Sequence, residues 1–458
     1  MKSRARLARV HVMVGGGSLI SSAGGALLTE TARLTGLNRR LSQGLRCWRG
    51  AGAVHDPGKI VQDLASAIAL GGDCLADIAV VRAQSDLFGP VASDPTVSRL
   101  VDKLAGDVEG ALHQLRTARA HARAVAWQHR CPVPAQGVVP VDIDGTIVVA
   151  HSEKESAAAT FKRTFGFHPL LAFVDHGPDG QGGGGEPLAA VLRPGSANAN
   201  TAADHITVLD LALAQLPEQV RARVLVRTDS GGGTKAFLQH VTALRLQYSV
   251  GVSVSIGIDR DLLARLPRTA WTAALDSNGQ PREAAQVAEL TGLLPGLTER
   301  GWPTGMRIIA RRERPHPGAQ LRLTDIEGWR ITVFATNSPG ENLAQLEVTH
   351  RLRARAEDRI RGLKDSGLRN LPLHDLAQNQ IWLETVLLAA DLLAWTATLG
   401  LSAHRKSEPK RLRLRLLHVA ARVVRSGRQT LLKLPDGWPW ADEIAAAHAR
   451  LRALPTPT

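Results

Sequence analysis

The chain has 458 residues, enough for about three domains of average size. Hydrophobic residues make up 44% and charged residues 21%, as is typical of a globular protein with a buried core. There are 56 lysine and arginine residues against 42 acidic residues, so the formal net charge is +14, which indicates a polyanionic partner. The 3 scattered cysteines exclude a disulfide framework or a cysteine zinc cage and predict a reducing, cytoplasmic environment.

The positive charge is concentrated near the two ends of the chain. Residues 1–50 sum to +8 and residues 401–433 to +9, so the remainder sums to 14 − 17 = −3. This distribution favours two nucleic-acid-binding flanks around a mildly acidic body, although solvated helical faces would give the same runs. Glycines interrupt the apolar stretch after the basic N-terminus, so we expect no secretion signal.

Residues 1–130 are expected to form mostly short helices. Leu27–Thr35 and Leu37–Leu45 have the spacing of a helix-turn-helix, or of a plain helical hairpin. In a second candidate, Asp94 would cap a helix whose first residue is Pro95. The residues that this second helix would present to a DNA groove are Thr96, Ser98 and Arg99.

The pattern changes from helices to strands after the proline-containing linker at Cys131–Pro134. Within residues 131–252 the predicted strands are Gly137–Ala150, Pro169–Val174, Pro187–Leu192, Arg223–Thr228 and Leu246–Val252. Helices are predicted at Thr201–Leu216 and after the glycine-rich turn Ser230–Gly233, which is either a phosphate cradle or a simple turn. A three-strand meander followed by alternating helices and strands predicts a mixed α/β sheet.

Residues 253–345 are expected to form a β-rich insertion. Asn278-Gly279 predicts a hairpin between strands at Trp271–Leu275 and Ala284–Leu290. Further predicted strands are Met306–Arg311, Leu321–Thr324 and Trp329–Ala335. Three tryptophans of this segment are expected to pack in the core or, alternatively, to stack on an unpaired base. They are Trp271, Trp302 and Trp329.

Helices are expected to resume in residues 346–400. The apolar stretch Ile381–Leu401 contains two acidic residues and therefore predicts a buried helix rather than a membrane span. Residues 401–458 are expected to form a basic C-terminal region with helices at Leu412–Arg425 and Ala441–Ala453. The residues expected to hold the DNA backbone, with strongly salt-dependent affinity, are Arg405, Lys406, Lys410, Arg411, Arg413 and Arg415.

Three acidic residues occupy positions suited to metal binding. Asp144 lies in the first core strand, Asp229 ends a later strand, and Glu357 lies in a predicted helix. A carboxylate in an apolar strand needs a partner or a metal, because burying it alone is costly. If the two strands are neighbours, about 4.8 Å apart, their carboxylates can share Mg²⁺ or Mn²⁺ with the third acid. Two such ions would support in-line attack on a phosphodiester.

The predicted helix from residue 350 to residue 364 provides a geometric criterion. Its spacing places one carboxylate and several basic groups on a single narrow stripe. The members of the stripe are His350, Arg353, Glu357 and Lys364. Alternating charge of this kind is usually a solvent-exposed face, but it also suits a metal-bound phosphate.

Three motifs follow one another in a characteristic order. They are Asp-Gly-Thr at 144–146, Asp-Ser-Gly at 229–231 and the pattern Y-x2-R-x3-E-x6-K at 350–364, with His350 in place of the tyrosine. This order resembles the DDE transposases of bacterial insertion sequences, and most closely the insertion sequence 1380 group. The resemblance covers nearly the whole chain, including Gly72–Ile78 and Phe88–Arg99.

The resemblance implies a fold, a reaction and partners. The fold would be an RNase H-like mixed-sheet core, interrupted by the β insertion, with two divalent metal ions. Asp144, Asp229 and Glu357 would be the catalytic metal ligands, while Arg353 and Lys364 would contact DNA; the role of His350 stays open. The reaction would be cleavage at terminal inverted repeats and joining of the 3′-hydroxyl ends to target DNA. The partners would be double-stranded DNA and a second copy of the chain, with no membrane and no small-molecule cofactor.

Two alternatives remain. Residues 142–146, Asp-Ile-Asp-Gly-Thr, also resemble the first motif of haloacid dehalogenase phosphatases, in which Asp142 would be the nucleophile and Asp144 the general acid/base. The context disfavours it, because the motif should open its domain and about 140 residues precede it here. The other alternative is a DNA-binding regulator or decayed transposase without catalysis, against which the presence of all three acids argues.

Overall fold

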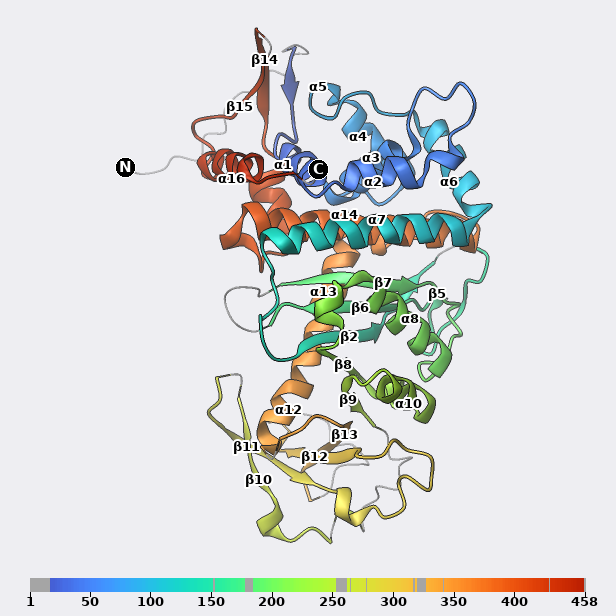
Figure 1. Ribbon diagram of the computed structural model, residues 1–458, viewed down its shortest axis with the longest axis vertical. Helices are drawn as coiled ribbons and strands as arrows, with labels where there is room; N and C mark the ends of the chain where they lie inside the picture. Colours follow the sequence, from blue (N-terminus) through green and yellow to red (C-terminus); the bar gives the residue numbers. More distant parts are fainter. Residues whose placement is uncertain are drawn as a thin grey trace.

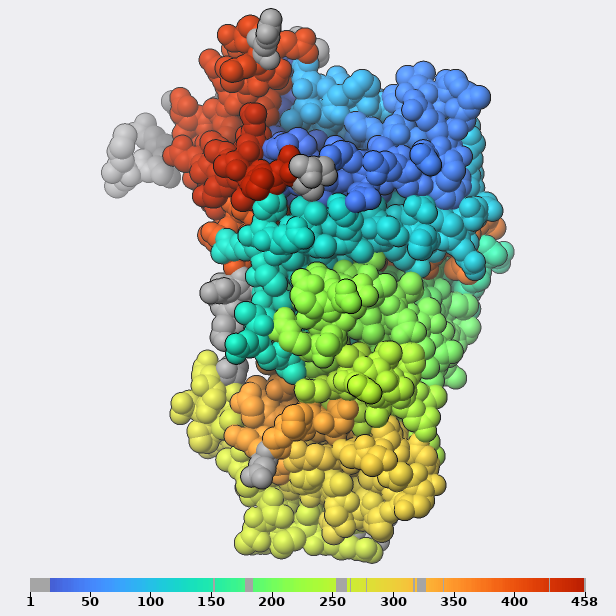
Figure 2. Space-filling view, viewed as in Figure 1, coloured from blue at the N-terminus to red at the C-terminus, as the bar shows by residue number. Residues whose placement is uncertain are grey.

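The computed structural model describes residues 17–150, 153–177, 184–252, 262–263, 265–276, 278–315, 318, 327–340, 342–427 and 429–456. The described chain is elongated, with helices at one end and a long sheet that runs to the other (Figure 1). The long helices α7 (Val108–His129) and α14 (Leu376–Gly400) pack on each other between these two parts. Figure 2 shows the same sequence of layers on the molecular surface.

The N-terminal helices form a bundle on α7 and α14. They are α1 (Gly25–Leu34), α2 (Leu37–Gly44), α3 (Pro57–Ala69), α4 (Ile78–Arg82), α5 (Ser85–Phe88) and α6 (Asp94–Ala105). The two predicted helices around Gly36 are confirmed, and this glycine has the positive φ of 70° that the turn requires. Helix α6 begins at Asp94 itself rather than at Pro95, so Ser93 occupies the capping position.

The core sheet is mixed, as the element order predicts. Within the described residues, nine strands pair in the order β10-β11-β12-β13-β9-β8-β2-β6-β7. The five strands of the core are β2 (Val139–Gly145), β6 (Leu170–Asp175), β7 (Gly185–Val191), β8 (Val224–Thr228) and β9 (Gln247–Gly251). The first three form the predicted antiparallel meander, and β8 and β9 add in parallel to β2. Helices that accompany these strands are α8 (Ala202–Gln215), α9 (Glu218–Arg221) and α10 (Lys235–Ala243).

The β-rich segment extends this sheet instead of forming a separate one. Its strands are β10 (Thr272–Leu275), β11 (Pro281–Glu289), β12 (Arg307–Glu313) and β13 (Arg330–Thr336). Strand β13 pairs with β9 through Ala335 and Val250, which joins the segment to the core. The turn at Gly279, with a φ of 81°, connects β10 to β11 as predicted. The strand expected at Leu321–Thr324 lies outside the described residues.

The long apolar helix α14 is internal. By length and composition it is the one helix in the described chain able to cross a membrane, but 89% of its most apolar window is buried in the fold. Its two acids, Glu384 and Asp391, pair with Arg119 and Arg123 of α7, and Arg123 also pairs with Glu186 of β7 at 2.7 Å. Buried carboxylates need such partners, so the network explains the charges in an otherwise apolar sequence.

The C-terminal region differs from the prediction. The expected helix Leu412–Arg425 is wrong, because α15 (Pro409–Leu412) continues only into a π-helical turn that ends at Leu417. Strands β14 (Ala421–Ser426) and β15 (Gln429–Lys433) follow, and β14 also pairs with β1 (Leu19–Ile20). β-branched residues and pairing with the distant N-terminus favour strand here. The predicted last helix is confirmed as α16 (Ala441–Ala453).

One prediction on stability arises from β9. Tyr248 is fully buried, and its hydroxyl has no hydrogen-bond partner among the described residues. A buried, unpaired hydroxyl costs about 1–3 kcal/mol, so Tyr248→Phe is expected to raise the free energy of unfolding by about 1 kcal/mol. Urea-unfolding midpoints of the two proteins measure this difference. A lower midpoint for the phenylalanine variant would show that the hydroxyl is bonded.

Candidate functional site

The first two acids lie side by side on neighbouring strands. Ile143 of β2 is paired in parallel register with Thr228 of β8, and Asp144 and Asp229 are the next residues on each strand. Their carboxylates accept hydrogen bonds from nearby backbone amides: Asp144 from Gly145 and Asp229 from Gly231, each at 2.8 Å. Both side chains are half-buried at the end of the strands.

The electrostatics of Asp144 depend on both other acids. The pKa of Asp144 is raised to about 6, mainly by burial and in addition by the negative charges of Asp229 and Glu357. The Gly145 amide and the charge of Arg353 lower it in part. Asp144 therefore lies within electrostatic range of both other acids and of one arginine of the predicted stripe.

The third acid comes from a helix that is interrupted, contrary to the prediction of one continuous helix. Helix α12 (Leu343–Arg351) is followed by a 3₁₀ turn at Leu352–Ala354 and then by α13 (Arg355–Leu363). Helix α13 packs on β2, β6 and β7 and carries the exposed Glu357 in its first turn. A 3₁₀ turn rotates the chain by a larger angle per residue than an α-helix does. Residues before and after the turn therefore no longer lie on the single stripe that a continuous helix predicts.

Two basic residues of the signature have different surroundings. Arg353 lies in the 3₁₀ turn, and its charge acts on both Asp144 and His350. Lys364 follows α13, and its Nζ donates to the carbonyl of Ile147 at 3.0 Å. Since Ile147 lies three residues after Asp144, this bond ties the end of α13 to the loop after β2.

His350 is a packed, neutral ring. It stacks on Phe334 with ring centroids 4.4 Å apart and planes 5° from parallel, and its Nδ1 lies 3.0 Å from the Ser249 hydroxyl. The pKa of His350 is lowered to about 3, mainly by burial and in part by the charge of Arg353. A neutral ring in this position supports β9 and β13; its contact with DNA remains a prediction.

The depressed pKa of His350 predicts a pH dependence of stability. The unfolded chain binds a proton at this ring below about pH 6.5, whereas the folded chain does so only near pH 3. The contribution of His350 to the free energy of unfolding is therefore fully present above pH 6.5 and is lost as the pH falls. Between these values it falls by about 1.4 kcal/mol per pH unit. Urea unfolding from pH 7 to pH 5 should therefore show a steeper loss for the wild type than for His350→Gln. Equal slopes would contradict the prediction, and other histidines cancel in the comparison.

The neighbouring Asp142 has a different role from Asp144. It forms a bidentate ion pair with Arg227 of β8, with distances of 2.6 Å and 2.9 Å, and is fully buried. Arg227 also bonds Asp175 at 2.9 Å and the carbonyl of Thr349 at 3.0 Å. A carboxylate held in this way is not available as a nucleophile, which disfavours the phosphatase alternative.

These acids stand in a chain whose sequence matches a family model, described as transposase DDE domain group 1, over residues 2–456. The chain belongs to this family. Among solved structures, the cryo-EM structure of a piggyBac transposase synaptic complex with hairpin DNA is similar at 9% identity and a TM-score of 0.39. The match covers 86% of this chain and 79% of the piggyBac chain. No curated protein matches the sequence.

The structure of this DDE-family chain adds a basic aromatic loop that the sequence analysis did not identify. Strands β4 (Ala158–Ala159) and β5 (Phe165–Phe167) flank a turn whose Phe161 is 69% exposed. The Phe161 ring lies 5.5 Å from that of His168, and Lys162 acts electrostatically on both His168 and Lys364. In the sequence, the tripeptide Phe-Lys-Arg at 161–163 was the feature that could have indicated this loop.

The glycine-rich turn after Asp229 is explained by packing. Residues Ser230–Gly232 form a 3₁₀ turn, and Thr234 caps α10. A Cβ on Gly233 would lie 2.7 Å from the carbonyl of Gly251, and one on Gly232 would lie 2.2 Å from the Thr228 hydroxyl. Close approach of the backbone therefore requires glycine here, which favours the simple turn over a phosphate cradle.

The predicted DNA-facing residues of the C-terminal region separate into two groups. Lys406, Lys410 and Arg411 are exposed, and Lys410 pairs with Asp365 at 2.9 Å. Arg405 and Arg415 are half-buried. Arg413 is only 8% exposed, and it donates to the carbonyls of Asp365 and Ala69. Its burial does not fit the expectation that it contacts DNA, because tertiary contacts take its donors.

The residues predicted at the N-terminal groove-binding helix lie on α6. Arg99 is exposed, whereas Thr96 and Ser98 are half-buried. The Thr96 hydroxyl lies 3.0 Å from that of Ser93 and 3.4 Å from a guanidinium nitrogen of Arg99. These local bonds are those of a helix N-terminus, and the contact of this helix with DNA remains a prediction.

The three tryptophans of the β-rich segment are engaged with cations. The Arg312 guanidinium lies 4.1 Å from the Trp271 ring and 4.8 Å from the Trp329 ring, and Lys235 lies 5.8 Å from Trp302. Trp271 and Trp302 are each only 8% exposed. Their burial favours the core role over stacking on a base.

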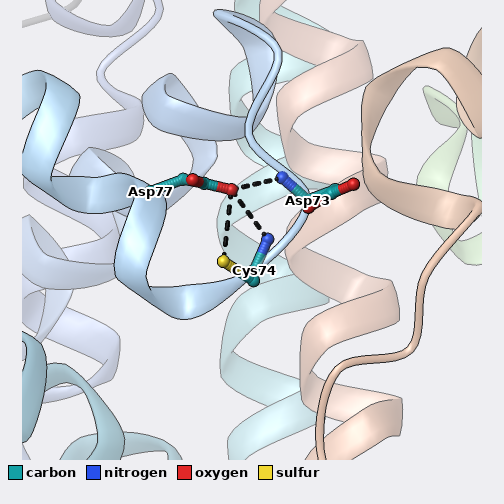
Figure 3. A group of neighbouring side chains, drawn as sticks. All are labelled: Asp73, Cys74 and Asp77. Atoms are coloured by element: carbon teal, nitrogen blue, oxygen red, sulfur yellow. Dashed lines mark hydrogen bonds between the residues drawn. The ribbon is translucent and has the colours of Figure 1, made fainter.

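A compact acidic group elsewhere is a local cap. Asp73, Cys74 and Asp77 are the one group in the described chain whose three possible ligand atoms lie within 4.8 Å of one another (Figure 3). The Asp77 carboxylate accepts from the backbone amides of Asp73 and Cys74 at 2.8 Å and 3.0 Å. Burial raises the pKa of the Cys74 thiol, which is therefore protonated. These bonds account for the group without a metal.

Proposed function

We propose that this chain is an insertion-sequence transposase, of the 1380 group, that cleaves DNA at the inverted repeats of its element. The adjacent places of Asp144 and Asp229 on β2 and β8, together with the effect of the Glu357 charge on Asp144, carry the proposal. The strand order β7-β6-β2-β8-β9 supports an RNase H-like core, with β10–β13 as the insertion. In the reaction, water attacks the phosphodiester and releases a 3′-hydroxyl, which then attacks a phosphodiester of the target.

The three acids fit a divalent metal site. Their oxygens are the hard ligands that Mg²⁺ or Mn²⁺ takes, and the raised pKa of Asp144 reflects its burial first and then the nearby charges of Asp229 and Glu357. Asp144, Asp229 and Glu357 would hold two ions, which when bound activate the attacking oxygen and neutralise the leaving one. Arg353 supplies a fixed positive charge for the phosphate, and Lys364 holds the loop after Asp144.

The DNA-binding surface that we propose combines the basic flanks with the loop beside the acids. Lys162 and the exposed Phe161 ring stand next to the site. The residues carried over from the sequence are Arg353, Lys364, Thr96, Ser98, Arg99, Arg405, Lys406, Lys410, Arg411 and Arg415. We further propose that the chain works in the bacterial cytoplasm and pairs with a second copy to join two DNA ends.

The alternative without catalysis is a DNA-binding regulator or decayed copy. It shares the basic flanks with the transposase and differs only in the reaction. Incubating the protein with a plasmid that carries its gene and native flanks, in Mg²⁺ or Mn²⁺, tests the two. Metal-dependent breaks at a pair of inverted repeats are expected, mapped at nucleotide resolution. Binding of the plasmid without breaks would favour the regulator. If the protein neither binds nor breaks the plasmid, both candidate functions are overturned.

A further inference from the structure

A basic pocket lies on the flank of α13 that faces away from Glu357. It encloses about 370 Å³ between α13, the start of β7 and the segment 405–412, within the range of about 300–1,000 Å³ typical of ligand sites. Arg355, Arg359 and Gly362 line it from one helical face. Glu357, about 200° around the helix from Arg359, points to the opposite side.

Two arginines of the pocket lining have nitrogen atoms without hydrogen-bond partners. The Nε and Nη1 atoms of Arg359 and of Arg405 are buried without hydrogen-bond partners among the described residues. Arg359 is anchored by Nη2, which bonds the carbonyl of Gly184 at 3.1 Å and pairs with Asp175 at 3.0 Å. Its Nη1 lies 3.6 Å from Asp142, too far for a hydrogen bond. The charge of Arg359 is therefore balanced by Asp175 and Asp142, whereas no carboxylate among the described residues pairs with Arg405, whose charge an anion in the pocket would balance.

Two glycines keep the wall of the pocket open. A Cβ on Gly185 would lie 1.9 Å from Nε of Arg359, and one on Gly184 would lie 2.7 Å from the carbonyl of Arg405. A side chain at Gly185 would displace the Arg359 side chain, and one at Gly184 would displace the backbone of residue 405. Glycine at 184–185 therefore lets this part of the chain pack closely on both residues of the lining.

The charges that surround the pocket favour an anion. Arg355, Arg359, Arg361, Arg405 and Lys406 line it, against Asp358 and Glu408. Both carboxylates are paired with Arg361, at 2.8 Å and 3.0 Å, and stand more than half exposed. Arg355 lies 3.4 Å from Asp175. The two acids of the lining thus share one arginine at the rim, and the lining as a whole keeps an excess of positive charge.

We propose that this pocket binds a phosphate of the DNA backbone distinct from the one that is cleaved. The inference rests on the proposed function, and it adds a second anchoring point about one helix diameter, roughly 10 Å, from Glu357. Arginine suits this ligand because its planar donors match phosphate oxygens in a fixed geometry. A contact of this kind would set the position of the duplex relative to the three acids without reading sequence.

The test compares Arg405→Gln with Arg452→Gln, a matched loss of charge at an exposed arginine outside the pocket. Binding of short duplexes taken from the native flanks of the gene is measured in EDTA at several salt concentrations. For Arg405→Gln we expect the DNA-binding affinity to fall several-fold. The slope of the logarithm of the binding constant against the logarithm of the salt concentration should become shallower by about one. The Arg452→Gln variant should bind DNA like the wild type. Arg405→Lys should keep the slope and recover only part of the affinity.

Two further readouts separate the possible outcomes. Removing an unpaired buried charge should not lower the thermal midpoint, whereas a structural role for Arg405 would. Inorganic phosphate at constant ionic strength should raise the wild-type midpoint more than that of Arg405→Gln. Loss of this protection with unchanged DNA binding would identify a free-phosphate site and overturn the proposal, as would no effect in either assay. A wild type that binds no DNA would instead remove the proposed function itself.

Discussion

Glu357→Gln is expected to abolish metal-dependent strand cleavage while leaving DNA binding intact. The amide keeps the size of the side chain but removes the charge that a divalent ion requires. Loss of one such preorganised group typically costs about 10²–10³-fold in rate, and a metal ligand should reach at least that range. Cleavage of the plasmid with native flanks, quantified at matched protein concentration, measures the effect.

Glu109→Gln is the matched control for this change, because Glu109 is an exposed acid in the first turn of α7, far in sequence from the site. It should cleave at the wild-type rate. Asp229→Asn should reproduce the loss, since Asp229 neighbours Asp144 across the paired strands. Cleavage near the wild-type level by either acid variant would exclude that residue from the metal site.

Arg123→Met is expected to destabilise the fold by about 3–5 kcal/mol, the cost of removing one partner from a buried ion pair. Arg123 is fully buried and contacts Glu186 at 2.7 Å and Asp391 at 2.7 Å. Without it, the negative charges at the junction of α7, α14 and β7 exceed the positive ones. Urea unfolding and soluble yield measure the effect.

The double variant Arg123→Met/Glu186→Gln tests the cause of that loss. It removes one charge of each sign, and the amide oxygen can still accept from one of the two indoles that bond Glu186, Trp127 at 2.9 Å or Trp395 at 3.0 Å. We expect it to recover about 1–3 kcal/mol relative to the single variant. Arg130→Met, at an exposed position just after α7, should change stability by no more than about 0.5 kcal/mol. A double variant as unstable as the single one would show that packing, not charge, dominates.

Much of the local structure was determined by the sequence. Apolar β-branched runs between turn residues predicted the five core strands, and their order predicted a mixed sheet. Asn278-Gly279 predicted the turn between β10 and β11 because a glycine there tolerates positive φ. The sequence also placed Asp144 in one strand and Asp229 at the end of another, and the structure pairs these two strands in parallel. These features depend on short-range preferences, which a single sequence carries.

Long-range pairing decided the rest. The sequence alone left Asp142 and Asp144 as rivals, and only the approach of Arg227 from β8 separates the paired carboxylate from the one near Glu357. Residues 421–426 became a strand because β1, about 400 residues earlier, offers backbone partners. Arg413 and the acids of α14 likewise found internal partners. Burial is a collective result of packing, so the same charged residue is solvent-exposed or internal according to neighbours that lie far away in sequence.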